Sequence, residues 1–86
     1  GVDREVGELA AARLRVGLRA RALLAAVEQL PDNLREAFTL VELEGLSRAE
    51  VGEQVGISPN NVGVRVHRAK KRLVKILNQA GWEVGS

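Results

Sequence analysis

Hydrophobic residues recur every three or four positions along most of this chain, with polar residues between them. The spacing is clearest in residues 58–77, where one apolar set keeps it over several turns. Its members are Val62, Val66, Ala69, Leu73 and Ile76. Side chains at this spacing share one side of an α-helix, so the stretch is predicted to be a helix with an apolar face. Ser58 and Pro59 mark its beginning, because a serine hydroxyl caps free N–H groups and proline fits the first turn.

A weaker pattern of the same kind covers residues 3–30 and predicts one helix or two. Arg13 interrupts the apolar face, and Gly7 and Gly17 each cost about 1 kcal/mol relative to alanine in a helix interior. The pattern is stronger in residues 20–29. The earlier part has no obvious partner for its apolar residues within so short a chain, so we expect it to pack on a second copy or on another domain.

Residues 31–44 are predicted to form a short helix that ends near Glu44, with Gly45 as its stop. The apolar residues of its core face are Leu34, Ala37, Phe38 and Val41. Leu40 and Leu43 lie on a different face. Packing against the first helix is the favoured interpretation of this pair, and a docking groove for a protein partner is the alternative.

The next helix begins at Ser47, which is followed three residues later by Glu50 in a capping box. Gly56 ends this helix. Gly52 lies at the position where this helix and the next are expected to approach each other most closely. Two helices joined by a tight turn that contains glycine form a helix-turn-helix pattern. The expected fold is therefore all-α, a four-helix domain with a C-terminal helix-turn-helix. The expected division is a linker or N-terminal helical extension at 1–20, a helix-turn-helix DNA-binding domain at 21–80 and a tail at 81–86.

The composition excludes several kinds of chemistry. The 86 residues include no cysteine and one histidine, His67, which rules out thiolate chemistry and a multi-histidine metal site. No Gly-rich phosphate loop is present, and the glutamates show no acid–base pairing. We therefore expect no enzyme, no cofactor and no metal. No apolar run is long enough for a membrane span. Gly1, in a sequence without methionine, suggests an excised domain of a longer protein or the remnant of a tag.

Charge is distributed unevenly along the chain, although the net value is only +2. Residues 28–54 carry seven acids against two bases, whereas residues 55–86 carry six bases against one acid. The molecule is thus predicted to be polarised, with a basic working end at the last helix.

The basic end coincides with the second helix of the motif, which favours DNA binding over simple solvation. Such a helix enters the major groove with its first turns near the bases. Asn60 is suited to adenine and Val64 to a thymine methyl, and Gly63 allows close approach of the backbone. Ser58 begins a helix whose N-terminus attracts anions. The residues expected to meet phosphates are Arg65, Arg68, Lys71 and Arg72.

Four stretches resemble the C-terminal DNA-binding region, region four, of bacterial sigma factors of the extracytoplasmic-function group. They are LPDNLREAF at 30–38, ELEGLS at 42–47, VGISP at 55–59 and VRVHRAKKRL at 64–73. The resemblance implies a domain that reads the minus-35 promoter element while bound to the β-subunit flap of RNA polymerase. It also implies an anti-sigma factor as a frequent regulator, and a cytoplasmic location at the bacterial nucleoid.

The family's DNA-facing positions correspond to six residues of this chain. They are Asn60, Asn61, Gly63, Val64, His67 and Arg68. Members often carry Lys or Arg where this chain has Gly63, so one contact to DNA is expected to be missing.

Two other functions fit parts of the pattern. The output domain of a LuxR or GerE type response regulator shares the Gly-Leu-Ser, Gly-Ile-Ser and Val-His elements, but its less basic ending fits worse. The other is a helical protein-interaction module whose acidic 28–54 surface binds a protein, without any role for DNA.

Overall fold

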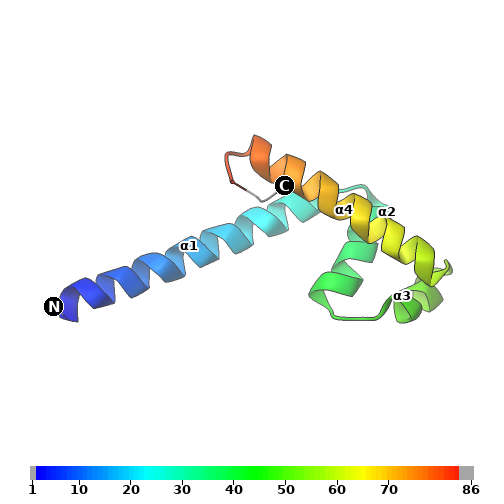
Figure 1. The fold of residues 1–86 in the computed structure, drawn as a ribbon, viewed down its shortest axis with the longest axis horizontal. Helices are drawn as coiled ribbons and strands as arrows, with labels where there is room; N and C mark the ends of the chain where they lie inside the picture. The colour runs from blue at the N-terminus through cyan, green and yellow to red at the C-terminus, as the bar shows by residue number, and fades with distance from the viewer. Residues whose placement is uncertain (1, 84–86) are drawn as a thin grey trace.

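The computed structural model describes residues 2–83, and within that range helices are joined by short loops without any strand (Figure 1). The elements are α1 (Val2–Glu28), α2 (Asp32–Phe38), η1 (Thr39–Leu43), α3 (Arg48–Val55) and α4 (Pro59–Gln79). Because η1 is a π-helical continuation of α2, the fold is the predicted four-helix arrangement. The all-α fold with a C-terminal helix-turn-helix, formed by α3 and α4, is confirmed.

α1 is one continuous helix, and only its C-terminal part packs against the rest of the chain. Leu23, Ala26 and Val27 join the core, whereas the earlier turns extend away from the other helices (Figure 1). Val6, Leu9 and Val16 on these turns are 59–67% exposed. The predicted division at residue 20 stays a prediction, since α1 passes through it without a break. Residues 84–86 of the predicted tail lie outside the described part of the chain.

Two apolar clusters hold the domain together, and α4 contributes to both. The first joins the end of α1 and Phe38 of α2 to Ala69 and Leu73 of α4. The second joins Ala37, Val51, Val62 and Val66, which are 0–5% exposed. The predicted apolar stripe of α4 is therefore its core face, although Ile76 is only half-buried.

The positions of Leu40 and Leu43 differ from those expected if the pair packed against the first helix. Leu40 is half-buried in the second cluster, with residues of α3 and α4, because η1 packs beside α3. Leu43 is 47% exposed. Packing of this pair against the first helix is thus wrong. The sequence pattern could not show this, because it assumed an ordinary α-helix, whereas the N–H of Glu44 reaches the carbonyl of Thr39 at 2.9 Å across a wider turn.

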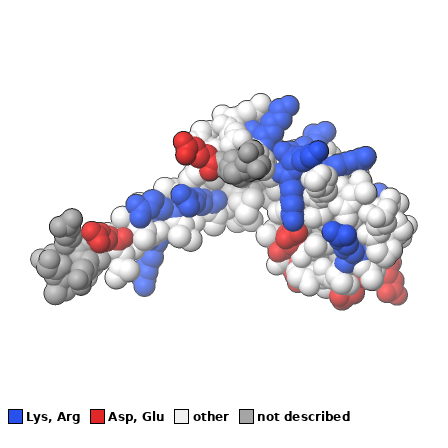
Figure 2. Space-filling view, in the orientation of Figure 1, with Lys and Arg blue, Asp and Glu red and all other residues white. Residues whose placement is uncertain are grey.

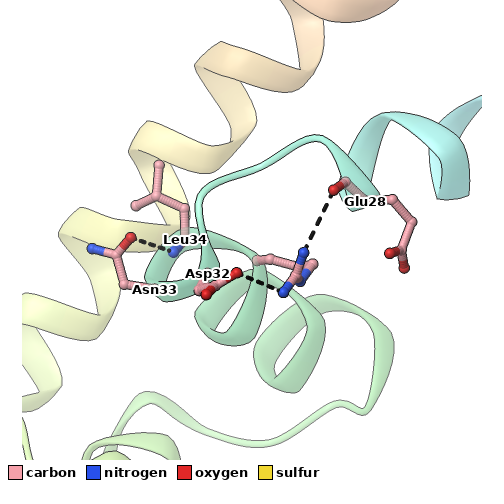
Figure 3. Close-up of polar contacts among 5 residues, drawn as sticks. Glu28, Asp32, Asn33 and Leu34 are labelled. Carbon is pink, nitrogen blue, oxygen red and sulfur yellow. Dashed lines mark hydrogen bonds and ion pairs between the residues drawn. The ribbon is translucent and has the colours of Figure 1, made fainter.

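Polar contacts at the junction between α1 and α2 involve Glu28 and Asp32 (Figure 3). The Nη2 atom of Arg35 lies 2.7 Å from Oδ1 of Asp32, and Nη1 donates to the carbonyl of Glu28 at 3.5 Å. The Asp32 side chain is 94% exposed and the Arg35 side chain 36%, so the ion pair is reached by solvent and its contribution to stability is small. These contacts connect α2 to Glu28, the last residue of α1.

Both helices of the motif begin with the predicted caps. The hydroxyl of Ser47 accepts a hydrogen bond from the N–H of Glu50 at 3.1 Å, and the Glu50 carboxylate accepts one from the N–H of Ser47 at 3.1 Å. The hydroxyl of Ser58 accepts from the N–H of Asn61 at 3.1 Å. These bonds define where α3 and α4 start.

We expect Ser58→Ala to lower the free energy of unfolding by about 1 kcal/mol, because the Asn61 N–H loses its partner. The melting temperature followed by circular dichroism should fall by about 4–8 °C. Ser58→Asn, which restores a capping oxygen, is the control and should melt close to the original chain. An unchanged melting temperature for Ser58→Ala would contradict a role for the cap in stability.

Candidate nucleic-acid interface

α4 presents a polar face opposite its core face. The buried residues Val62, Val66, Ala69 and Leu73 point into the two clusters, and none is more than 5% exposed. The polar face is built by exposed residues of the predicted site. They are Asn60, Asn61, His67, Arg68, Lys71 and Arg72, together with Val64, which is 38% exposed. Because one side of α4 is buried, its other side faces the solvent as one continuous surface.

The first turns of this face are poor in charge. Asn60, Val64 and His67 follow one another at intervals of four and three, so they share one stripe of the helix. Such a stripe offers an amide, an apolar surface and an imidazole to a partner. This combination matches the donors, acceptors and thymine methyl groups that base edges display in the major groove.

The N-terminus of α4 has little backbone capacity left for an anion. Pro59 has no N–H, and the N–H of Asn61 is taken by the Ser58 hydroxyl. The N–H of Val62 donates to the carbonyl of Ser58 at 3.1 Å. In the first turn, the amide of Asn60 is the one that remains for the anion site expected at Ser58.

Farther along α4 the surface becomes cationic. Figure 2 shows Lys and Arg side chains gathered over α4, with Asp and Glu side chains along the opposite edge of the same face. Arg68, Lys71 and Arg72 line a surface hollow of about 400 Å³ together with Pro31, Asn33 and Leu34 from the start of α2. The fold thus brings three predicted phosphate contacts to one concave site that has room for a phosphate group. Arg65 is half-buried and lies outside this hollow.

One cation of α4 is already paired within the molecule. The Nζ atom of Lys70 lies 2.9 Å from Oε1 of Glu42 in η1. Lys70 was not among the predicted contacts, and this ion pair directs it toward the acidic part of the chain.

Gly63 is half-buried, and the side chain of Arg48 lies beside it, so its backbone is less open to a partner than expected. A Cβ atom placed on Gly63 would lie 2.9 Å from Nη1 and 3.0 Å from Cζ of Arg48. The guanidinium of Arg48 therefore occupies the space that the glycine leaves. Sequence reasoning missed Arg48, because helical periodicity relates residues within one helix and Arg48 belongs to α3. The available signal was a long cation at the start of α3 and a glycine on the facing helix.

Only one of the two residues proposed for a protein partner lines the hollow beside α2. Leu40 lines a hollow of about 400 Å³ with Glu28, Asp32, Arg35, Glu36 and Thr39, but Leu43 is not among the residues of that hollow. Their role in docking a partner stays a prediction.

Two further properties concern residues 2–83 only. No group of three or more His, Cys, Asp or Glu side chains in this range is placed to hold a metal ion. No helix in it is long and apolar enough to cross a membrane.

Comparison with known proteins finds one matching family model and several similar proteins. A family model described as sigma-70, region 4 matches residues 20–73. The chain is 41% identical over 64 residues to the RNA polymerase sigma factor CarQ of Myxococcus xanthus. The matched stretch covers 74% of this chain and 37% of CarQ. It is 39% identical over 51 residues to the ECF RNA polymerase sigma factor SigE of Mycolicibacterium smegmatis, covering 59% of this chain and 20% of SigE. It is 37% identical over 51 residues to the RNA polymerase sigma factor SigZ of Bacillus subtilis, covering 59% of this chain and 29% of SigZ. The chain therefore spans well under half the length of these curated relatives.

Proposed function

We propose that this chain, which belongs to the sigma-70 region 4 family, binds the minus-35 element of promoters. It does so as part of a sigma factor of the extracytoplasmic-function group. In that role it directs RNA polymerase to promoters in transcription initiation and catalyses no reaction itself. The observation that carries the proposal is the family match over residues 20–73, which includes α3 and α4 as far as Leu73, with the predicted DNA-facing residues.

The proposed mechanism divides α4 into two parts. Its first turns enter the major groove, where Asn60 pairs with an adenine edge and Val64 contacts a thymine methyl. Asn61 and His67 extend this contact along the same face. Arg65, Arg68, Lys71 and Arg72 bind phosphates, which sets the register of the helix on the duplex without reading sequence. The hollow lined by three of these cations is the proposed principal phosphate seat.

The proposed partners follow from the family. They are promoter DNA and core RNA polymerase, which the domain contacts at the β-subunit flap, and an anti-sigma factor as regulator. The proposed location is the bacterial cytoplasm, at the nucleoid. Leu40 and the exposed Leu43 are the proposed contacts to a protein partner.

Two alternatives receive less support. The three relatives compared above are all named as sigma factors, which favours this family over the output domain of a LuxR or GerE type response regulator. A helical interaction module without DNA binding does not account for three cations gathered in one hollow beside the helix-turn-helix.

The test is a selection of duplexes from a randomised pool by the 86-residue chain, followed by titration of the enriched duplex at increasing salt. We expect one short motif to be enriched and the binding constant to fall steeply with salt, because several phosphates are neutralised. Retention of the chain on an immobilised β-subunit flap tests the polymerase contact separately. If no duplex binds at low salt, DNA binding is excluded for this chain.

We expect Asn60→Ala to change which duplexes are enriched, because it removes the side chain placed on a base edge. Discrimination at one base position should fall about tenfold. The measurement is the relative affinity for the enriched duplex and its single-base variants. Gln79→Ala, at the far end of α4, is the control and should leave the preference unchanged. If Asn60→Ala keeps the original preference, Asn60 does not read a base.

A further inference from the structure

The stability of α3 does not explain why an arginine occupies position 48. It is the first residue of α3, where the helix dipole disfavours a positive charge. The capping box at this terminus uses Ser47 and Glu50, not Arg48. Among the residues that the structure describes, Arg48 has no ion-pair partner, and it is exposed. Its guanidinium is therefore available to a ligand outside the chain.

The guanidinium lies against α4 at one flank of the predicted base-reading stripe. Gly63 comes three residues after Asn60, and its missing side chain makes room for Nη1, Cζ and Nε of Arg48 at 2.9–3.2 Å from a built Cβ. At the usual helical spacing, Gly63 and Lys70 fall on this flank, whereas Arg65, Arg68 and Arg72 fall on the other. Because Lys70 is paired with Glu42, α4 itself has no uncommitted cation on the Gly63 flank.

We propose that Arg48 is a further DNA-binding residue, which contacts a backbone phosphate on the strand facing the Gly63 flank of α4. This inference rests on the proposed function. A helix in the major groove has a phosphate backbone on each side, and the cations of α4 serve one side. Arg48 supplies the cation for the second side from α3. The contact that Gly63 lacks is thereby provided across the helix-turn-helix.

The test compares the 86-residue chain with Arg48→Met, which keeps a flexible apolar cover over Gly63 but removes the charge. The probe is a mixed-sequence duplex of about two helical turns, titrated from about 50 to 200 mM salt. We expect Arg48→Met to bind about tenfold more weakly at about 50 mM salt, and the slope of log K against log salt to decrease in magnitude by about 0.9. Arg48→Lys should keep the slope, because the charge remains.

Arg15→Met is the matched control, since it removes the same charge from the exposed part of α1. The double variant Arg48→Met with Gly63→Lys should regain the slope, because α4 then carries the cation itself. A thermal melt of each variant separates loss of binding from loss of folding.

An unchanged salt slope for Arg48→Met overturns the proposal, as does a loss of affinity that Gly63→Lys does not reverse in the folded double variant. A changed base preference overturns the assignment to phosphate. If the unaltered chain binds no duplex, both the proposed function and this inference are wrong. If the unaltered chain binds but Arg48→Met matches it, only this inference fails.

Discussion

Replacing Gly52 with alanine is expected to lower the free energy of unfolding by about 3 kcal/mol. A Cβ atom at this position would lie 2.5 Å from the carbonyl oxygen of Ile57 and 3.4 Å from the nitrogen of Pro59. Both are backbone atoms, one in the turn between α3 and α4 and one in the first residue of α4, so a side-chain rotation cannot relieve the clash. The N–H groups of Gly56 and Ile57 also donate to the carbonyl of Gly52, at 2.8 and 3.0 Å, which ties the turn to the glycine.

Thermal unfolding followed by circular dichroism measures this effect, and the melting temperature should fall by about 15 °C. Gly17→Ala makes the same chemical change in α1, where a Cβ meets nothing within 4 Å. That control should melt at or slightly above the original temperature, because alanine favours helix over glycine. If the two variants melt alike, the close approach of α3 and the turn is not what requires glycine at position 52.

Removing two cations from the proposed phosphate seat should have an effect of similar size on DNA binding. We expect the double variant Arg68→Ala, Arg72→Ala to bind a mixed-sequence duplex about 100-fold more weakly at about 50 mM salt. Both side chains line the hollow between the start of α2 and α4, and neither is buried. Loss of two phosphate contacts should reduce the magnitude of the salt slope by about 1.8.

The matched control is Arg15→Ala with Arg19→Ala, which removes the same net charge from exposed positions of α1. It should change affinity much less, because these arginines lie outside the helix-turn-helix. Equal losses in the two double variants would show that net charge, and not the seat on α4, governs binding. A double variant that lost base preference while keeping its salt slope would contradict the assignment of Arg68 and Arg72 to phosphates.

The candidate site was partly predictable because most of it lies on one helix. The apolar positions of α4 determine which side is buried, and the exposed side then follows from the same periodicity. This reasoning placed Asn60, Val64 and Arg68 on the outward face, where the structure has them. It could not show that Arg68, Lys71 and Arg72 share a hollow with Asn33, because that depends on where the start of α2 lies against α4.

The sequence by itself determined the caps of α3 and α4, where these two helices begin, and the core face of α4. These features depend on residues that are neighbours along the chain, such as the Ser47–Glu50 capping box and the Ser58 cap, so local spacing is sufficient to predict them. The same local logic identified the helix-turn-helix pattern and the position of its close approach at Gly52.

Only the tertiary structure decided which side chains meet between helices. The burial of Leu40 depends on the π-helical turn at η1, and the pairing of Lys70 with Glu42 depends on how η1 packs near α4. The placement of Arg48 over Gly63 depends on the crossing of α3 and α4. Such contacts are set by the angle and distance between packed helices, which periodicity within one helix does not specify.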